Sequence, residues 1–273
     1  MMLAQSDELI SEMSSRAKTM DNRILESLER IEWEHGVDIL YACESGSRAW
    51  GFASPNSDYD VRFIYVHPET RYLSISRQRD VIEEPIVDEL DVNGWDLRKA
   101  LLLMRKSNPT LLEWLHSPVV YRMDELFLHR LRQLALKSLD RRALFHHYSS
   151  MARHDWRKLQ AAEESPLKRY FYILRTALCA LWTSDPELSA MPPVPFGKLV
   201  EGTVSCKNVR VAIDELLHLK VISAEKCSIP RVGVIDDFLF NLLAELEQMQ
   251  VKKAEPLAES CFDQLFLETL RAG

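Results

Sequence analysis

A short turn between two apolar segments is the feature that most constrains the fold of this chain. Residues Val37 to Cys43 are rich in strand-forming side chains and lead directly into Gly46-Ser47. Ten residues after Ser47, Ser57 opens the sequence Ser57-Asp58-Tyr59-Asp60, which continues into the apolar residues Phe63 to Val66. This order predicts a strand, a turn and a second strand, with a pair of acids where the second strand begins.

Both parts of this pattern carry side chains or backbone groups that suit a nucleotide site. Asp58 and Asp60 are two residues apart, so on a strand they project to the same face, where their oxygens can bind Mg²⁺. The backbone N–H groups of the Gly46-Ser47 turn can bind a phosphate, and we expect the Ser47 hydroxyl on the β- and γ-phosphates. A Gly-Ser pair alone is usually only a turn, and an isolated Asp-x-Asp is usually a solvated strand end. Together, at this spacing, they predict a site for a nucleoside triphosphate and metal.

The segment from Glu44 to Gly51, together with Ser57 to Arg62, resembles the nucleotidyltransferase motif of the DNA polymerase β superfamily. More narrowly, it is similar to a subfamily of nucleotidyltransferases linked to RNA repair. The resemblance implies transfer of a nucleoside monophosphate from a nucleoside triphosphate to an acceptor hydroxyl. It also implies a two-metal site for Mg²⁺, with Mn²⁺ as an alternative, held by Asp58, Asp60 and a third carboxylate on a neighbouring strand.

Three residues are candidates for the third carboxylate. Asp91 lies between Leu90 and Val92, the apolar-acid-apolar pattern of the family. Asp96 precedes an expected helix, where an N-cap role already explains it. Asp88 lies beside a second acid, nearer the start of the same apolar segment. The apolar neighbours favour Asp91, and the other two remain alternatives.

Two arginines are close to the motif in sequence. Arg48 follows Ser47 directly and can reach a phosphate, or equally form a salt bridge with Glu44. Arg62 is two residues past Asp60, so it projects to the same strand face as the acids. It either contacts a phosphate or offsets the charge of the carboxylates when metal is absent.

A second basic segment lies further along the chain. Lys168, Tyr172 and Arg175 are spaced at i, i+4 and i+7, which places them on one face of a helix. The two cations suit phosphates and the tyrosine suits stacking on a base, so we expect these residues to bind the nucleotide. The alternative is a surface helix whose aromatic side chains face the core.

The order of the expected elements divides the chain in two. Strand-like segments are confined to the first 122 residues, after an amphipathic helix from Ser6 to Trp33. We therefore expect an α+β protein: a mixed sheet with helices in a catalytic domain over residues 1–122, then an all-helical domain over 123–273 that could bind nucleotide or acceptor. The remaining segments of regular structure are expected at 80–84 and 86–92 (strands), 97–106 and 109–115 (helices), 119–121 (strand), and 125–139, 141–163, 167–182, 209–218, 234–250 and 255–270 (helices).

The net charge, the apolar runs and the cysteines of the chain indicate which partners and which cellular compartment to expect. The chain has 273 residues and a net charge of −7, so it has no general basic field for nucleic acid, although the family resemblance favours RNA. The acceptor therefore stays open among an RNA end, a protein and a small molecule. No apolar run is long enough to span a membrane, the start lacks the features of a signal peptide, and the five cysteines are scattered. We expect a reduced, cytoplasmic protein without a membrane partner.

The same residues also occur in proteins of other functions. A glycosyltransferase also uses Asp-x-Asp, but after a nucleotide-binding unit for which the sixty or so residues before Asp58 leave little room. A haloacid-type phosphatase carries Asp-x-Asp at the end of an apolar strand, whereas a turn precedes Asp58 here. A catalytically degenerate nucleotide-binding or antitoxin-like module is the remaining alternative, and retention of both aspartates argues against it.

Overall fold

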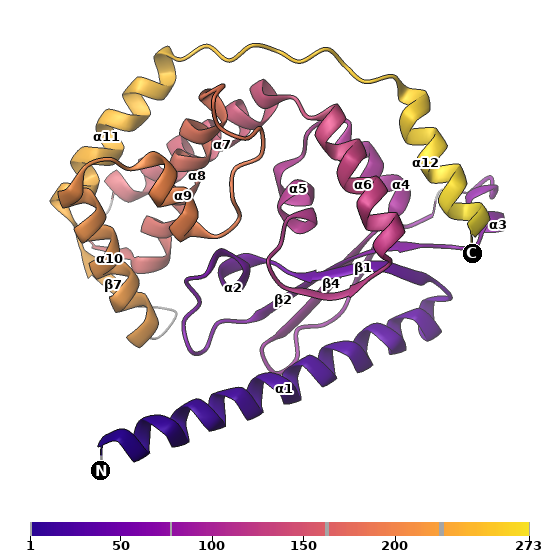
Figure 1. Ribbon diagram of the computed structural model, residues 1–273, viewed down its shortest axis with the longest axis horizontal. Helices are drawn as coiled ribbons and strands as arrows, with labels where there is room; N and C mark the ends of the chain where they lie inside the picture. The colour runs from indigo at the N-terminus through magenta and orange to yellow at the C-terminus, as the bar shows by residue number, and fades with distance from the viewer. Residues whose placement is uncertain (1, 77, 162–163, 224–226, 273) are drawn as a thin grey trace.

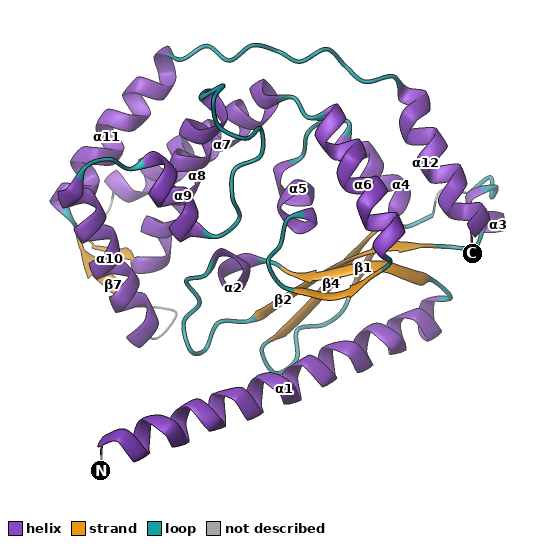
Figure 2. Cartoon of the chain, viewed as in Figure 1, coloured by secondary structure: helices purple, strands orange, loops and turns teal. Residues whose placement is uncertain are grey.

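The computed structural model describes residues 2–76, 78–161, 164–223 and 227–272, and for residues 2–18 it describes the backbone. The first half is a five-stranded sheet with helices on both faces, and the second half is mainly helical (Figure 1, Figure 2). The strands of the sheet are β1 (Asp38–Glu44), β2 (Tyr59–Val66), β3 (Val81–Glu83), β4 (Leu90–Asp96) and β5 (Val120–Met123). The helices of this half are α1 (Met2–His35), α2 (Gly46–Trp50), α3 (Glu69–Tyr72), α4 (Leu97–Met104) and α5 (Pro109–Leu115).

The second half folds as successive helices joined by loops. Its elements are α6 (Glu125–Ser138), α7 (Arg141–Gln160), β6 (Glu164–Pro166), α8 (Leu167–Ser184), α9 (Phe196–Thr203), α10 (Lys207–Ile222), β7 (Ser228–Pro230), α11 (Gly233–Gln248) and α12 (Glu259–Ala272). Among the described residues, no helix combines the length and apolar character that a membrane span needs.

The sheet is mixed, as the sequence predicts. Its strand order is β3-β4-β2-β1-β5, with β2 and β4 parallel and the other neighbours antiparallel. The parallel pair sets Asp60 directly beside Asp91. The α+β fold class is thereby confirmed.

Strand alternation divides the side chains of β2 between two layers. Val61, Phe63 and Tyr65 are buried against α1, in a cluster that includes Ile24 and Leu28. Each such apolar side chain contributes roughly 1.5–3 kcal/mol when it is fully buried. The residues between them, including Asp60, therefore face the opposite side of the sheet, where α4, α5 and α6 lie (Figure 1).

The second hydrophobic cluster joins both halves of the chain. It begins with β-sheet residues such as Ile64, continues through Phe171 of α8, and includes Leu265 of α12. The segment 249–258 crosses the molecule and brings α12 back against α4 and α6 (Figure 1). The change from sheet to helices falls between β5 and α6, close to residue 122, yet packing is continuous across it. Division into two domains stays a prediction.

Several local elements differ from the sequence expectation, including the short helix α2 where a turn was expected. The strand expected at 86–92 is β4, Leu90–Asp96, because Asp88 and Glu89 adopt positive φ angles of 49° and 65° in a turn. Helix α9 begins after Pro195, in the stretch between the helices expected at 167–182 and 209–218, for which the sequence predicts no regular structure. The helical half also contains the two-stranded pair β6-β7, whose strands of three residues are too short to show a periodicity. The end expected for α7 at residue 163 lies outside the described residues.

Candidate active site

The turn at Gly46 is shaped around the carboxylate of Asp60. Gly46 has a φ of +59°, and a Cβ built there would lie 2.0 Å from Asp60 Oδ2. The backbone N–H of Ser45 donates to the carbonyl of Asp60 at 2.8 Å, which fixes the turn to the start of β2. Only a glycine satisfies both the positive φ angle and the close approach. Helix α2, with Ser47 in its first turn, starts at this point.

Arg62 bridges two carboxylates that the parallel strands bring together. Its Nη2 atom donates to Asp60 Oδ1 at 2.9 Å and to Asp91 Oδ2 at 2.7 Å. Its Nη1 atom donates to the backbone carbonyl of Asp91 at 2.9 Å. The side chains of Asp60, Asp91 and Arg62 are 28%, 26% and 17% exposed, so they are half-buried but accessible. Arg62 thus offsets the charge of both acids, and its alternative contact with a phosphate stays a prediction.

The electrostatics of Asp60 show which other charges share this site. Burial raises the pKa of the Asp60 carboxyl, the charge of Arg62 lowers it, and the charges of Asp91 and Asp58 raise it further. Lys168 of α8 also lowers this pKa. Asp58, Asp91 and Lys168, a lysine from the helical half, therefore lie close enough to Asp60 to change its pKa.

The other two candidates for the third carboxylate lie elsewhere. Asp88 is in the turn before β4, where its side chain is 75% exposed and pairs with Arg23. Asp96 is buried and accepts a hydrogen bond from the N–H of Arg98, so it caps α4 as expected. Asp91 is the candidate that lies beside Asp60, and its role as a metal ligand stays a prediction.

Glu44 is a site residue that the sequence reasoning considered only as a partner of Arg48. It ends β1, is buried, and accepts a hydrogen bond from the backbone N–H of Asp60 at 2.8 Å. Its other carboxylate oxygen accepts from the hydroxyl of Tyr121 on β5. Burial raises the pKa of Glu44 to about 7. The sequence held one indication that Glu44 belongs to the site, because this acid lies inside the motif, directly after the apolar strand.

Arg48 holds the loop that carries Asp58. Its Nε atom donates to the carbonyl of Asp58 at 3.1 Å, and its Nη2 atom donates to the carbonyl of Ser57 at 2.7 Å. The guanidinium also lies 3.6 Å from the ring centroid of Tyr59. These contacts order the acidic loop. Among the described residues no salt bridge joins Arg48 to Glu44, and a contact of Arg48 with phosphate stays a prediction.

Helix α8 brings two of its three predicted residues to the site. Lys168 Nζ lies 5.7 Å from the ring centroid of Tyr172, and that ring meets Trp50 of α2 edge-on with centroids 5.5 Å apart. Arg175 instead points into the interior, with its side chain 4% exposed and Nη1 donating to Glu113 Oε1 at 2.9 Å. Its buried position leaves it no access to a phosphate in this structure.

Glu113 of α5 is the centre of a buried network behind α2. It accepts hydrogen bonds from Arg175, from the hydroxyl of Tyr148 at 2.9 Å, and from Trp50 Nε1 at 3.2 Å. The Arg175 guanidinium also lies 4.4 Å from the ring centroid of Trp50. Sequence reasoning missed Glu113 because its partners come from α2, α7 and α8, far apart in the chain.

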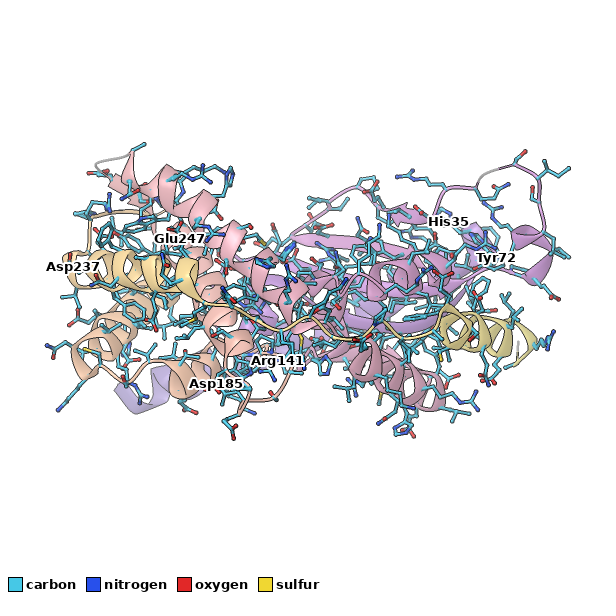
Figure 3. The ribbon with its side chains drawn as sticks, turned by 90° about the horizontal axis from the view of Figure 1, so that it is seen from above. His35, Tyr72, Arg141, Asp185, Asp237 and Glu247 are labelled. Carbon is cyan, nitrogen blue, oxygen red and sulfur yellow. The ribbon has the colours of Figure 1, made fainter. Side chains whose placement is uncertain are left out.

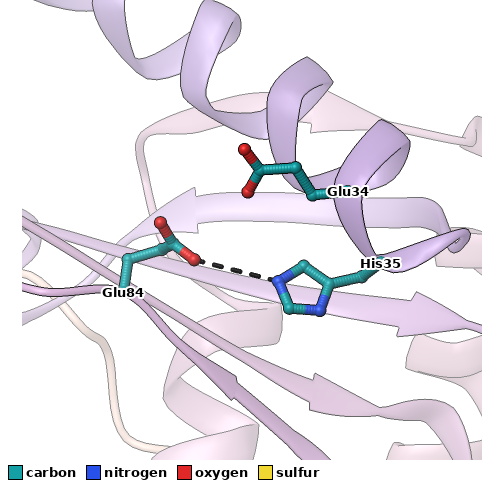
Figure 4. Close-up of side chains that lie close together, drawn as sticks. All are labelled: Glu34, His35 and Glu84. Atoms are coloured by element: carbon teal, nitrogen blue, oxygen red, sulfur yellow. Dashed lines mark ion pairs between the residues drawn. The ribbon is translucent and has the colours of Figure 1, made fainter.

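A second group of acids and a histidine lies at the C-terminal end of α1. Ligand atoms of Glu34, His35 and Glu84 are all within 4.8 Å of one another, and His35 Nε2 lies 3.9 Å from Glu84 Oε1 (Figure 4). Arg30 already pairs with both carboxylates, at 2.8 Å and 2.7 Å. Because Arg30 supplies the positive charge, this group needs no metal ion to be satisfied.

The donor set at Asp60 fits a hard divalent cation. Asp58, Asp60 and Asp91 supply carboxylate oxygens only, the ligands that Mg²⁺ prefers. A cation, the guanidinium of Arg62, already lies between two of them in this structure. The site thus combines three carboxylates, a lysine and the Gly46-Ser47 turn.

Comparison with known proteins finds a matching family, a similar sequence and a similar solved structure. The sequence profile of RlaP, the RNA repair pathway DNA polymerase beta family, matches residues 20–268. An uncharacterized protein, YcgL of Bacillus subtilis (strain 168), is 42% identical over 240 residues, which cover 88% of this chain and 90% of that protein. A nucleotidyltransferase-like protein from Exiguobacterium sibiricum 255-15 matches in structure over 91% of this chain and 80% of its own, at 11% identity. Its TM-score of 0.28 carries no argument about function.

The profile match extends from α1 to α12 and includes the turn, the three acids and the face of α8. The chain therefore belongs to the RNA repair pathway DNA polymerase beta family.

Proposed function

We propose that this protein transfers a nucleoside monophosphate from a nucleoside triphosphate to an acceptor hydroxyl, using Mg²⁺. The observation that carries the proposal is the pairing of Asp60 with Asp91 across parallel strands, beside the Gly46-Ser47 turn. Membership of a polymerase β-type family supports the same chemistry.

Each residue of the site has a role in this proposal. Asp58, Asp60 and Asp91 would hold the metal, which when bound neutralises phosphate charge and makes the acceptor hydroxyl more reactive. Ser47 and the turn bind the triphosphate, and Lys168 pairs with one of its phosphates. Tyr172 offers a ring to the base. Glu44 acts through the backbone N–H of Asp60, from which it accepts a hydrogen bond, and it touches no substrate.

For the acceptor, we propose an RNA end. The description of the family supports this choice, because it names RNA repair. The net charge of −7 requires that RNA be bound by a local basic surface. A protein hydroxyl and a small molecule are the other outcomes that the experiment must separate.

The proposal is tested with nucleoside triphosphates labelled at the α-phosphate, in the presence of Mg²⁺ and either RNA or a protein extract. We expect label on RNA, and a loss of at least about 100-fold in Asp60→Asn. The matched control is Asp88→Asn, the same change in an exposed turn whose positive φ angle suits asparagine. Comparable Mg²⁺-dependent transfer by a folded Asp60→Asn protein would refute the proposal.

One observation favours a second candidate, a catalytically silent nucleotide-binding module. Arg62 forms ion pairs with both Asp60 and Asp91, so the chain itself supplies a counter-charge for these carboxylates. Calorimetric titration with nucleoside triphosphates separates the two candidates. A silent module binds the triphosphate equally well with Mg²⁺ and with EDTA, whereas the transferase requires Mg²⁺ for tight binding.

A further inference from the structure

A pocket at the far end of the sheet is not used by the proposed reaction. It lies where β2 and β4 end, about six residues along β2 from Asp60, a distance of roughly 20 Å. Its walls come from α3, the segment after it, and the first turn of α4, and they enclose about 520 Å³. This volume lies within the range of small-ligand sites. Figure 3 shows Tyr72 of this pocket near one end of the molecule, with Asp237 and Glu247 near the other.

The pocket is basic although the chain is acidic. Among the described lining residues, four are cations and two are acids: Arg71, Arg79, Arg98 and Lys99, against Asp80 and Asp96. Cations thus outnumber acids along the described lining by four to two, in a chain whose net charge is −7. Burial and the charge of Arg71 lower the pKa of His67 to about 4, so this lining residue is neutral.

Two of these cations have no carboxylate directly across from them. Lys99 pairs with Asp80 at 3.3 Å, and Arg79 pairs with Glu83. The guanidinium of Arg98 lies over the Tyr72 ring instead, 4.9 Å from its centroid. For Arg71, no ion pair or side-chain hydrogen bond is found with any residue in the part of the chain that the structure describes. Arg71 therefore has its donors available.

A buried network fixes the floor of the pocket. The backbone N–H of His67 donates to the Tyr72 hydroxyl at 3.0 Å, and this hydroxyl donates to Asp96 Oδ2 at 2.8 Å. The other oxygen of Asp96 accepts from the N–H of Arg98 at 2.7 Å. The charge of Asp96 is thus directed inward, to the hydrogen bonds that position α3 and α4. The arginines next to Tyr72 and Asp96 consequently project from a fixed backbone.

We propose that this pocket binds phosphate groups, as a second anion site separate from the carboxylate site. The planar guanidinium of Arg71 or Arg98 can donate two parallel hydrogen bonds to a phosphate. The exposed hydroxyls of Ser74 and Ser76 line the same wall and add donors. The guanidinium groups of Arg71 and Arg98 thus suit phosphate groups, which can be the phosphodiester monoanions of a nucleic-acid strand or part of a free inorganic anion.

Binding of two probes to the full chain tests this proposal. The first is a fluorescent single-stranded RNA, followed by anisotropy at several salt concentrations, and the second is inorganic tripolyphosphate, followed by calorimetry. We expect Arg71→Ala to weaken binding about tenfold, and for RNA to reduce the slope of log K against log salt by about 0.7. The matched control is Arg157→Ala, an exposed arginine on α7. Mg²⁺-dependent triphosphate binding is measured in parallel, and Arg71→Ala should leave it unchanged.

The outcomes separate the two sources of phosphate. Binding of RNA alone identifies a nucleic-acid strand, and binding of tripolyphosphate alone identifies a free anion. Hydrogen exchange of residues 67–76 should slow when the successful probe binds, which locates it without any variant. The proposal is overturned if neither probe binds, if Arg71→Ala and Arg157→Ala behave alike, or if exchange slows only near Asp60. If the protein fails to bind the triphosphate in the presence of Mg²⁺, that result counts against the proposed function. It does not bear on the proposal that the pocket binds phosphate groups.

Discussion

Arg62 shows at the scale of one residue how two facing carboxylates can be stable side by side. Asp60 and Asp91 would repel each other across adjacent strands, and the guanidinium between them offsets that repulsion. A divalent ion at the same carboxylates competes with this arginine. Loading of the site should therefore depend on how strongly Arg62 holds its two partners.

We expect Arg62→Met to bind Mg²⁺ about fivefold more tightly than the unchanged protein, because removal of one half-buried ion-pair partner is worth about 1 kcal/mol. The metal-free variant should be less stable, since two facing carboxylates lose their counter-charge. Calorimetric Mg²⁺ titration and urea unfolding measure both effects, and Arg122→Met, which loses pairs with Glu29 and Glu32, is the control. Weaker Mg²⁺ binding in a folded Arg62→Met protein would show that the arginine helps to hold the metal.

Gly46 gives a second prediction at this scale. Alanine at 46 would be strained by its φ of +59° and would also press on Asp60, whereas alanine at Gly51 meets strain alone, with φ +83° and no atom within 4 Å of its Cβ. We expect Gly46→Ala to lose both stability and Mg²⁺-dependent activity, and Gly51→Ala to lose only about 1 kcal/mol of stability. Melting curves and the transfer assay test this, and equal activity losses would contradict it.

His67 predicts a pH dependence of stability. Its folded-state pKa is lowered to about 4 by burial, by the charge of Arg71 and by that of His35, against an ordinary value of 6.5. Because the folded state favours the neutral ring, this contribution to stability is complete above pH 6.5 and is lost as the pH falls toward 4. His67→Gln should flatten urea-unfolding stability over that range, and exposed His129→Gln should not. Equal pH profiles for His67→Gln and the unchanged protein would exclude this assignment.

At the scale of elements, the parallel pairing of β2 with β4 creates the site. The expected strand over 86–92 had the wrong limits, but Asp91 kept the same alternation inside β4, with Leu90 and Val92 buried on the α1 side. The side chain of Asp91 therefore faces away from α1, as Asp60 does. The face to which a strand residue projects depends only on its spacing from its neighbours in the sequence. It can therefore be predicted correctly even when the ends of the strand are not.

The buried pair of Arg175 and Glu113 lies where four helices meet: α2, α5, α7 and α8. It predicts how strongly these helices depend on one ion pair. Arg175→Met leaves a buried carboxylate without its cation and should cost about 3–5 kcal/mol of unfolding free energy. Arg169→Met on the same helix is the control. Combining Arg175→Met with Glu113→Gln should cost less than the sum of the two, because the orphaned charge is removed as well. Additive losses in urea unfolding would mean that the two groups are not coupled.

At the scale of the whole molecule, one hydrophobic cluster joins the sheet, the helical half and α12. This cluster predicts a single unfolding transition for residues on both sides of position 122. Tryptophan fluorescence and far-ultraviolet circular dichroism should give coincident urea curves. Phe262→Ala on α12, a buried change worth about 3 kcal/mol, should shift the whole curve, whereas Leu267→Ala at an exposed position should not. Two separate transitions would instead support independent domains.

The sequence by itself determined the local features: the strand-turn-strand order around Gly46-Ser47, the spacing of Asp58 and Asp60, the face of Asp91, and the N-cap at Asp96. These depend on backbone periodicity and on residues close in the chain. Tertiary structure alone decided the partners. It directed Arg48 to the loop carbonyls, buried Arg175 against Glu113, set Glu44 beneath Asp60, and enclosed the basic pocket at the end of β2. The physical reason is that a long charged side chain points toward whichever partner folding brings within reach. Which residues become neighbours in the folded protein cannot be read from their spacing along the chain.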